Sequence, residues 1–497
     1  MKRLILTLSI FFLLSVSLKA QFYVTGDDPG RVRWNIMDTD HFSLIYPEGT
    51  DSLAREYGYK LEKFRIPVSR TTGYLNKGRM PVVIHAYNAA NGSVAWAPKR
   101  MDLFTIPSPY APEPMPWSTM LSVHEGRHVT QMQFGMTRAQ KPIGWFFGEM
   151  WNILASLVYP GLSNIEGDAV IAETALTNSG RGRTADFLNY YKVAFDSGDF
   201  RRWDQWRLGS QRRYAPDHYA LGYLTVGGFR YLYDCPGFMK EGYELSARRP
   251  YNLAAFYTTT KNLTGKKFAD AFEEVCRTMQ VIWKVEADAR APFIPMEQVT
   301  KEPRLYTDYQ GTAFLNGELY SIRKGHETTP VLVRIGTDGK EKTLSRFAYQ
   351  TSRLKASDEQ GRLYWSETLT DARWSLKSDS GIRYYQVGKI GKKTLTDRND
   401  LLYNPSVNPV DGSMASVEYG VDGSSSITVI EGIGGMVLTS DKGPSGVQLI
   451  ETAWVGDDIL ATGITDEGYG IYRYSDRRWS VVLEPQPVKI KDFQTYG

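Results

Sequence analysis

Two sequence patterns alternate four times in the part of the chain that follows Pro303. The first pattern, a glycine turn between apolar residues, occurs at 316–320, 360–364, 411–414 and 456–460. The second pattern, a strand, a turn and a strand, occurs at 332–344, 383–395, 427–438 and 471–482. Two hairpins in every unit of about 40–50 residues are typical of the blades of a β-propeller, which has about 4–8 blades. The repeat therefore predicts an all-β, propeller-like domain over residues 299–497 with about four blade-sized repeats, and an irregular β-sandwich is the alternative.

The preceding part, residues 21–298, has a different pattern, in which strands come before helices. Short apolar runs at 40–47, 80–86 and 92–107 are typical of strands, and residues 51–74 are typical of a helix between the first two. Helical spacing of apolar residues then dominates at 117–134, 165–177, 214–233 and 267–287. Strands followed by helices predict an α+β domain.

Residues 1–20 have the composition of an export signal. A basic start precedes an uncharged apolar run over 4–18, which ends in Lys19 and Ala20. A positive start, an apolar run of about 7–15 residues and a small final residue are typical of a secretory signal peptide. A membrane span would need about 20 apolar residues. We expect residues 1–20 to be removed, and the mature protein to be periplasmic or secreted and to have no membrane span. An uncleaved anchor is the alternative, because Leu18 is larger than the residue usual at that position before a cleavage site.

The charge of the chain is nearly balanced, with 59 Lys and Arg against 55 Asp and Glu and a net charge of +4. A nucleic-acid-binding domain usually concentrates basic residues on one face, so we expect no nucleic-acid partner. The two cysteines, Cys235 and Cys276, cannot form a disulfide framework or a four-thiolate zinc site. They are able to form one bridge, and the sequence does not decide whether they do.

The residues that carry chemistry begin with His124, Glu125 and His128, an H-E-x-x-H pattern. On a helix, positions four apart lie one above the other, so both imidazoles can bind one metal ion. Glu125 is rotated about 100° away and is placed to take a proton from an attacking water rather than to bind the metal. A catalytic zinc also needs a third protein ligand and an open position. We therefore expect a Zn²⁺ site, and two hydrogen-bonded histidines on an apolar helix face are the alternative.

A second run, formed by Glu166, Gly167, Ala169 and Glu173, follows downstream as E-G-x-A-x-x-x-E. H-E-x-x-H followed by this run resembles the gluzincin metallopeptidases, the group that includes thermolysin and the large zinc aminopeptidases, and is most similar to their peptidase-MA-like branch. The resemblance covers roughly residues 40–287 and implies a zincin-like fold. It also implies that Glu166 is the third zinc ligand and that Glu173 supports the site from behind.

The third ligand has a rival and an alternative role. Glu149 is also a candidate, because its spacing from His128 is nearer that of thermolysin-like enzymes. We prefer Glu166 because of the glycine, the alanine and the second glutamate around it. Ser163 followed by Glu166 is, however, also the pattern of a capping box, in which the glutamate folds back on the start of its own helix.

These groups can hydrolyse a carbonyl–nitrogen bond. Zinc polarises the carbonyl and lowers the pKa of a water toward about 7, and Glu125 passes the proton to the leaving amine. The oxyanion then needs a hydrogen-bond donor, which in the enzymes that this chain resembles is often a tyrosine or histidine on a later helix. The run at 216–223 looks like that helix, which makes Tyr219 the first candidate, ahead of Tyr223 and His218.

Three further features have both a functional and a structural interpretation. The strand around 93–100 either binds an extended substrate by strand addition, as the same resemblance implies, or is an ordinary sheet strand. An arginine-rich stretch either lines the cleft and favours acidic substrates or forms a solvated face. Its members are Arg181, Arg183, Arg201, Arg202, Arg207, Arg212 and Arg213. His41, His85 and His326 have no partners at metal-ligand spacing and are interpreted as structural.

The sequence thus predicts an exported zinc-dependent peptidase of gluzincin type, acting on a peptide or protein substrate and followed by a propeller-like domain. The second domain resembles the TolB-like or WD40-like β repeats of exported bacterial proteins, which implies that it gates substrates or docks a protein partner. The alternative is a non-catalytic exported binding or scaffold protein that works through its propeller. A metal hydrolase acting on another amide, such as cell-wall peptides, is a third interpretation.

Overall fold

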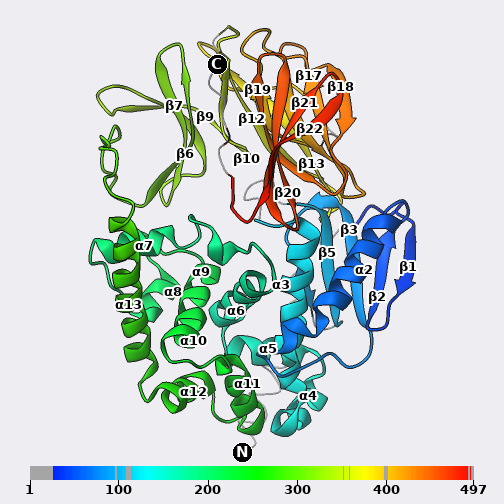
Figure 1. The fold of residues 1–497 in the computed structure, drawn as a ribbon, viewed down its shortest axis with the longest axis vertical. Helices are drawn as coiled ribbons and strands as arrows, with labels where there is room; N and C mark the ends of the chain where they lie inside the picture. The colour runs from blue at the N-terminus through cyan, green and yellow to red at the C-terminus, as the bar shows by residue number, and fades with distance from the viewer. Residues whose placement is uncertain are drawn as a thin grey trace, which may run out of the picture.

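The structure is a computed structural model that describes residues 26–95, 98–107, 114–350, 352–357, 359–396, 401–490 and 493. The expected signal peptide over 1–20 lies outside the described residues. A helix-rich half and a β-rich half follow each other along the chain (Figure 1). Within the described residues, no helix combines the length and the apolar character that a membrane crossing requires.

The first half is built on a five-stranded mixed sheet with the order β1–β2–β3–β5–β4. Its strands are β1 (Trp34–Asp38), β2 (Phe42–Pro47), β3 (Met80–Ala89), β4 (Ser93–Ala95) and β5 (Arg100–Ile106). The three central strands are parallel, whereas β1 and β4 pair antiparallel at the two edges. Alternate apolar residues of β2 and β3 are buried because one face of the sheet packs on α2 (Asp51–Arg65) and α3 (Trp117–Gln131). The α+β order of the first half is therefore as predicted.

The other helices of the first half enclose a second apolar core beside the sheet (Figure 1). They are α4 (Lys141–Phe147), α5 (Met150–Val158), α6 (Leu162–Leu176), α7 (Asn189–Asp196), α8 (Trp203–Leu208), α9 (His218–Gly222), α10 (Gly228–Leu232), α11 (Phe238–Arg248), α12 (Ala255–Thr264) and α13 (Phe268–Asp288). Short 3₁₀ turns join some of them, among them η2 (Met132–Met136), η3 (Arg138–Gln140) and η4 (Arg181–Arg183), and a π-helical turn, η5 (Tyr223–Gly227), joins α9 to α10.

Two predicted helices differ from the observed ones. The helix expected over 51–74 ends at Arg65, because Pro67 lacks the N–H that would continue it and instead begins a 3₁₀ turn. The helix expected over 214–233 begins at His218, where Asp217 accepts a hydrogen bond from the Ala220 N–H as its cap. Neither difference moves a predicted site residue out of its helix.

The second half consists of four antiparallel sheets that follow each other in chain order. Their strands are β6 (Thr307–Leu315), β7 (Glu318–Gly325), β8 (Val331–Ile335) and β9 (Glu341–Arg346); β10 (Tyr349–Gln350), β11 (Lys355–Ser357), β12 (Arg362–Thr370), β13 (Ser378–Gln386) and β14 (Lys392–Thr394); β15 (Leu402–Val407), β16 (Met414–Tyr419), β17 (Ser425–Ile430) and β18 (Val437–Lys442); and β19 (Gln448–Val455), β20 (Asp458–Thr465), β21 (Gly468–Ser475) and β22 (Arg478–Gln486). The first sequence pattern forms the turn into β7, β12, β16 or β20, and the second pattern forms the last hairpin of each sheet. Gly317 and Gly361 show why glycine recurs, since they take φ angles of 74° and 59° in these turns. The predicted repeat is confirmed.

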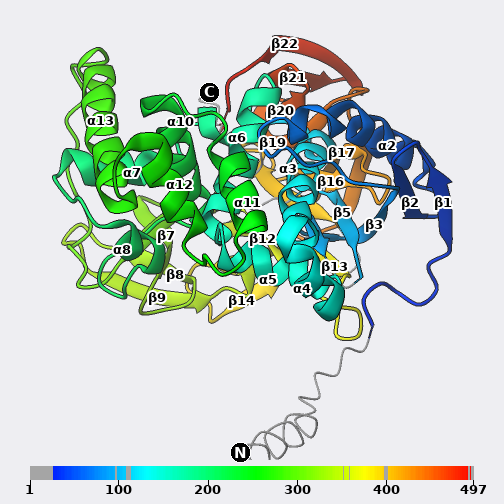
Figure 2. The same ribbon diagram turned by 90° about the horizontal axis from the view of Figure 1, so that it is seen from below.

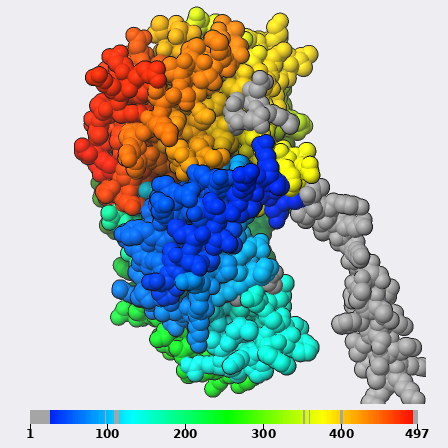
Figure 3. All heavy atoms as spheres, turned by 90° about the vertical axis from the view of Figure 1, so that its right-hand side faces the viewer, coloured from blue at the N-terminus to red at the C-terminus, as the bar shows by residue number. Residues whose placement is uncertain are grey.

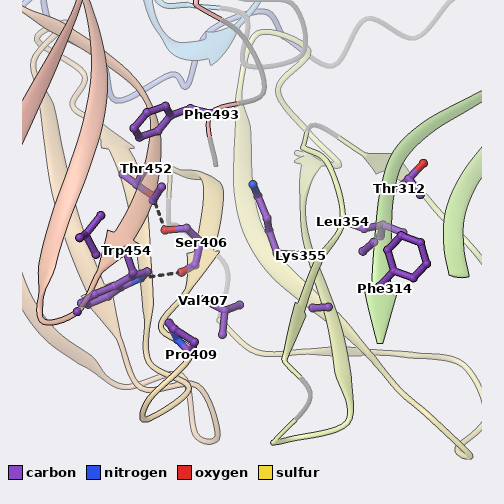
Figure 4. Close-up of a pocket in the computed structure, with 15 residues that line it drawn as sticks. Thr312, Phe314, Leu354, Lys355, Ser406, Val407, Pro409, Thr452, Trp454 and Phe493 are labelled. Carbon is purple, nitrogen blue, oxygen red and sulfur yellow. Dashed lines mark hydrogen bonds between the residues drawn. The ribbon is translucent and has the colours of Figure 1, made fainter. Parts of the chain in front are cut away.

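One strand from each of the four sheets, β6, β11, β15 and β19, lines a common cavity of about 400 Å³ (Figure 4). Phe314 of β6, Lys355 of β11, Ser406 of β15 and Trp454 of β19 all line it. Hydrogen bonds join two neighbouring sheets there, between Ser406 Oγ and Thr452 Oγ1 at 2.7 Å and from Trp454 Nε1 to the Ser406 carbonyl at 3.2 Å. Sheets arranged around a common cavity are the arrangement of a β-propeller.

The two halves pack directly on each other, and residues 289–306, which form no helix or strand, connect them. Ile106 at the end of β5 is buried in an apolar cluster of the third and fourth sheets. The Trp117 N–H at the start of α3 donates to Gln448 Oε1 at 2.9 Å, and the rings of Tyr214 and Tyr306 stack with centroids 4.0 Å apart. Seen from below, α11 and α12 lie in front of the β-rich half (Figure 2).

The two cysteines do not form a disulfide. Cys235 follows α10 and Cys276 lies in α13, and both are buried free thiols. Burial raises the pKa of both thiols, so they stay protonated and pack as small apolar groups. The question that the sequence left open is thereby answered.

His85 of β3 ties the segment before β1 to the sheet. Its Nδ1 lies 2.8 Å from Asp28 Oδ2, and its Nε2 lies 3.1 Å from Asp102 Oδ1. Burial favours the neutral imidazole, but the hydrogen bonds to the two carboxylates outweigh burial and raise the pKa of His85 to about 9. His85 thus has the structural role that its sequence context predicts.

We expect this group to make the free energy of unfolding depend on pH. Because the pKa of His85 is about 9 when folded and 6.5 when unperturbed, its contribution is complete below pH 6.5 and is lost as the pH rises through about 9. His85→Gln should lower stability by on the order of 2 kcal/mol near pH 6 and much less near pH 9.5. Urea unfolding at both pH values measures the difference. His326→Gln, at an exposed histidine, is the control, and an unchanged pH dependence in His85→Gln would contradict the assignment.

Candidate metal centre

Helix α3 brings the two histidines of the H-E-x-x-H pattern together. The chain enters the helix through Pro116, and every residue from Trp117 to Gln131 is buried, because α3 lies between the sheet and α6. His124 and His128, one turn apart, point the same way, and their Nε2 atoms are 3.0 Å apart. Two imidazole nitrogens this close need a shared proton or a shared cation between them.

Glu166 of α6 completes the group. Its Oε2 lies 3.1 Å from His124 Nε2 and 3.1 Å from His128 Nε2. Within the described part of the chain, these three side chains form the one cluster whose ligand atoms are close enough to share a metal ion. Ligands about 2.0–2.1 Å from a tetrahedral zinc are about 3.3 Å apart, so the three atoms have nearly the spacing that the ion requires.

The other roles considered for the glutamates do not fit the structure. Gly161 is the N-cap of α6 and no side chain caps it, so Ser163 and Glu166 do not form a capping box. Glu149 is exposed, and its Oε2 accepts a hydrogen bond from the Lys99 N–H at 2.8 Å. Glu149 is not part of the cluster, because the histidines meet Glu166 instead.

A further shell of hydrogen bonds fixes both imidazoles. His124 Nδ1 donates to Glu173 Oε1 at 2.6 Å, and the fully buried Glu173 also accepts from Arg181 Nε at 3.0 Å. His128 Nδ1 donates to Gln131 Oε1 at 2.7 Å. Because each Nδ1 carries its proton outward, each Nε2 presents its lone pair to the centre. Glu173 thus lies where its predicted supporting role requires.

Asp168 holds this shell together from α6. Its Oδ2 accepts from Gln131 Nε2 and from Arg127 Nε, both at 2.8 Å, and its Oδ1 accepts from Arg230 of α10 at 2.7 Å. The carboxylate has no exposed surface, so it needs both guanidinium groups as counter-charges. Asp168 therefore positions Gln131, which in turn positions His128.

Acidic groups dominate the electrostatics of the centre. Burial disfavours the charged form of His124, but hydrogen bonds to Glu166 and Glu173 outweigh it and raise the pKa of His124 to about 10. Burial alone would raise the pKa of Glu166, but the two imidazoles beside it lower it. A site that binds protons this firmly also attracts a divalent cation that can replace them.

Glu125 lies beside the cluster without joining it. It is 3% exposed, and its Oε2 has no hydrogen-bond partner among the described residues. Burial raises its pKa, against the opposing charges of His124 and His128. A Cβ atom placed on Gly92 would lie 2.9 Å from Glu125 Oε1, so the carboxylate rests against the backbone just before β4. A buried carboxylate oxygen without a partner is costly, and it marks a place for a water or a substrate group.

Of the three donors proposed for an oxyanion, Tyr219 is the one whose ring lies beside the histidine pair. Its centroid is 5.9 Å from that of His124, and the Arg181 guanidinium lies 4.9 Å from its ring. A cavity of about 320 Å³ opens next to Tyr219 and Arg181. The ring of His218 lies against that of Tyr219, with centroids 4.5 Å apart and the planes tilted by 32°. Tyr223, by contrast, packs on Phe187 with centroids 5.5 Å apart.

The placement of Tyr219 depends on a very close helix crossing. A Cβ atom on Gly167 of α6 would lie 1.9 Å from the carbonyl carbon of Gly222 in α9. A Cβ atom on Gly222 would lie 1.6 Å from the Ser163 carbonyl oxygen. The two backbones touch, so only glycine fits at either position. Glu166 precedes Gly167 on α6, and Tyr219 lies one turn before Gly222 on α9. The crossing therefore holds these two side chains on adjoining helices.

Of the arginine-rich stretch, Arg181 is the member bound to the centre. Arg201 pairs with Asp199 and Arg202 with Asp204, and Arg183 donates to backbone carbonyls. The remaining members lie at the surface and are Arg207, Arg212 and Arg213. Sequence spacing gave no signal for Gln131 or Asp168, which meet across α3 and α6, and it did not distinguish Arg181 from the other arginines of its stretch.

Comparison with known proteins assigns no family, since no family model and no curated protein matches the chain. Solved structures with a partial likeness include the acylaminoacyl peptidase of Pyrococcus horikoshii, at 12% identity over 37% of this chain and 33% of that one, with a TM-score of 0.28. A nidogen–laminin complex is 14% identical over 38% of this chain and 69% of that one, with a TM-score of 0.29. The tricorn protease is 12% identical over 35% of this chain and 22% of that one, with a TM-score of 0.28. The chain thus spans a third of the acylaminoacyl peptidase, and a likeness this distant carries no conclusion about function.

The glycine crossing predicts that Gly222→Ala separates the two helices. Overpacking costs about 1–3 kcal/mol where side chains can yield, and here the clash is with backbone, so we expect a loss at the upper end of that range. The variant should also take up metal more weakly, because Glu166 moves away from the histidines. Thermal unfolding and metal content measure both effects.

Gly237→Ala is the matched control for this experiment. A Cβ atom there meets nothing within 4 Å, and its φ of −83° suits alanine. We expect wild-type stability and metal content for Gly237→Ala. A wild-type result for Gly222→Ala as well would show that the crossing is not as close as described.

Proposed function

We propose that the protein is an exported zinc-dependent peptidase that hydrolyses peptide bonds. The observation that carries the proposal is the triangle of His124 Nε2, His128 Nε2 and Glu166 Oε2, with sides of 3.0, 3.1 and 3.1 Å. A buried carboxylate without a partner, that of Glu125, lies beside this triangle. Three ligands and an adjacent base are the parts that a catalytic zinc site needs. The resemblance of the sequence to gluzincin peptidases supports the same reaction.

The donor set fits Zn²⁺. Two imidazoles and one carboxylate, each imidazole oriented through its Nδ1, are common ligands of a catalytic zinc. Zn²⁺, when bound by His124, His128 and Glu166, supplies a Lewis acid that polarises the scissile carbonyl and makes a water more acidic. Glu173 and Gln131 keep the two rings in the orientation that binding requires.

Glu125 is the general base in this proposal. Its Oε2 is free to accept the proton of the attacking water, because it accepts no hydrogen bond from the described residues. The same carboxyl group then delivers the proton to the amine that leaves as the carbon–nitrogen bond breaks. The surrounding burial keeps other water from competing for the carboxylate.

Tyr219 is the donor to the oxyanion. Burial and the nearby charge of Glu166 raise the pKa of its phenol, so the hydroxyl keeps its proton and donates a hydrogen bond to negative charge that forms on the carbonyl oxygen. The Arg181 guanidinium over the ring, itself bound to Glu173, restrains its position.

Strand β4 is the proposed platform for the substrate backbone. It is the antiparallel edge of the sheet, so one side of its backbone is available for strand addition. Gly92, just before β4, touches Glu125. An extended peptide added to this edge would therefore pass the general base.

The propeller half supports a second candidate function, that of a non-catalytic binding protein. Among the described residues, its cavity is lined by apolar side chains such as Phe314 and Trp454 and by the polar side chains of Lys355 and Ser406, a mixture that suits the binding of a ligand or partner. The triangle of His124, His128 and Glu166, with Glu125 beside it, favours the peptidase. In that proposal the propeller selects substrates or docks a protein partner.

Metal content and one substitution test the peptidase. Purified protein should hold about one zinc per chain. Glu125→Gln should keep the zinc and lower turnover of a peptide library, profiled by mass spectrometry, by about 10²–10⁴-fold. Glu149→Gln, at the exposed glutamate outside the cluster, is the control and should change neither the zinc content nor the turnover of the library. Wild-type protein that binds no zinc and cuts no peptide would favour the binding protein instead.

Tyr219→Phe should separate the oxyanion donor from metal binding. Because it removes one hydroxyl, we expect kcat to fall by about 10²–10³-fold with KM and zinc content nearly unchanged. Tyr223→Phe removes a hydroxyl that packs away from the histidines and should retain full turnover. Equal effects of the two substitutions would argue against the role given to Tyr219.

A further inference from the structure

Helices α4 and α5 form a hairpin that exposes large apolar side chains. Trp145, Phe146 and Phe147 of α4 are 84%, 76% and 55% exposed. Four residues of α5 continue the exposed surface, and we call the whole set the apolar hairpin: Trp145, Phe146, Phe147, Met150, Leu154, Leu157 and Val158. Single exposed apolar residues are common, but a contiguous set of this kind marks a binding surface.

The polarity of α5 is the reverse of that of a helix on a water-facing surface. Its buried residues are Asn152, Ala155 and Ser156, and the Ser156 hydroxyl donates to the Asn152 carbonyl at 2.7 Å. Four of its six large apolar residues, among them Leu154 and Leu157, are exposed. The other two, Trp151 and Ile153, are half-buried against the apolar cores. A surface helix normally buries its apolar stripe and exposes its polar one, so this helix is built to present apolar side chains.

Close packing prevents the hairpin from turning over to bury these side chains. A Cβ atom on Gly144 of α4 would lie 2.1 Å from Met136 Sδ, and one on Gly135 of η2 would lie 2.7 Å from Asn152 Oδ1. Trp151 Nε1 also donates to Gln140 Oε1 at 2.9 Å. The exposed face is therefore fixed in place.

The hairpin lies at the end of the molecule away from the propeller half. In Figure 1, α4 lies at the lower right and the sheets of the second half lie at the top. In the space-filling view, the cyan atoms of this region form the lower right corner, far from the orange and red sheets (Figure 3).

Basic side chains border the apolar hairpin. Lys141 begins α4 and is exposed, and Arg138 precedes it on η3. The end of α11 lies beside η3, where Gln140 Nε2 donates to the Ser246 carbonyl, and it adds Arg248 and Arg249 to this border. Two acids lie nearby, Glu149, which is exposed between the two helices, and Glu244, which pairs with both Arg138 and Arg248. The four basic residues outnumber them. The border therefore carries net positive charge.

We propose that the apolar hairpin docks the protein on the surface of a lipid bilayer that contains anionic lipids. Exposed Trp and Phe with leucines enter the boundary between headgroups and acyl chains, and a basic border pairs with anionic headgroups. The protein would lie on the membrane rather than span it. Leu162, exposed in the first turn of α6, extends this surface to the helix that carries Glu166. The proposal does not depend on the proposed hydrolysis.

Vesicle sedimentation tests the proposal. We expect the protein to sediment with phosphatidylcholine–phosphatidylglycerol vesicles, less so with phosphatidylcholine alone, and less at high salt. The triple substitution W145S/F146S/F147S should weaken binding at least tenfold. M150S/L157S, on the second helix, should weaken it in the same direction. Lys141→Gln should weaken binding to the anionic vesicles and leave that to phosphatidylcholine unchanged.

The matched control replaces exposed apolar residues elsewhere, Leu208→Ser, Met296→Ser and Ile390→Ser, and should bind like the wild type. All variants should remain folded and unfold cooperatively on heating, which circular dichroism measures. The triple variant should lose a little stability, because Phe147 also stacks on Trp151. Two results would overturn the proposal. One is vesicle binding that is absent or equally strong in the triple variant. The other is a dimer, dispersed by the triple substitution, which would make the hairpin an interface between copies of this chain.

Discussion

Buried negative charge on α6 determines how the helical half of this protein is assembled. Glu173 and Asp168 have no exposed surface and Glu166 has little, and an unpaired charge in such a place costs several kcal/mol. Each acid therefore needs a partner from another element. The partners are His124 and His128 of α3 for Glu166, His124 and Arg181 for Glu173, and Arg127 and Arg230 for Asp168. Buried ion pairs of this kind add little stability over apolar packing. We therefore interpret the network as one that fixes the positions of the helices and of the side chains they carry. Glu125 is the one acid of the centre that this pairing leaves out.

Two further features hold the helices of the centre in place. One is the close backbone contact between α6 and α9, and the other is hydrogen bonding from α3 to the propeller half. The glycine crossing of α6 and α9 lets Tyr219 approach the histidine pair. Helix α3 has no side-chain cap of its own, because Pro116 is its N-cap. Instead Gln448 and Asp466 of the fourth sheet accept hydrogen bonds from the first turn of α3, from the Trp117 N–H and the Thr119 hydroxyl. The negative charge of the Asp466 carboxylate near the N-terminus of α3 also interacts favourably with the helix dipole. The second half therefore stabilises the helix that carries both histidines.

The sequence predicts what is local and little of what is distant. The repeat of glycine turns gives the four sheets, and helical spacing gives the helices of His124 and Glu166 to within a few residues. The choice of Glu166 over Glu149 agrees with the geometry, although it rested on a resemblance. Gln131 and Asp168 were missed, because they meet each other across α3 and α6, and no spacing reveals that contact. Arg181 was predicted only as one of seven arginines, because its contacts with Glu173 and His124 are set by tertiary structure. Strand β1 and the close glycine crossing were missed for the same reason, since pairing and helix contact are decided by tertiary structure.

The apolar hairpin shows the same limit most clearly. From 145 to 158 the chain reads as an apolar run, and an apolar run is usually core. Only the structure shows that Asn152 and Ser156 face the protein while most of the large apolar side chains of the hairpin are exposed. Each large apolar side chain left in water forgoes about 1.5–3 kcal/mol of burial, a loss that the glycine contacts at Gly135 and Gly144 make permanent in the isolated chain. A surface so fixed recovers that free energy only when something apolar covers it, and a bilayer does so without requiring a groove.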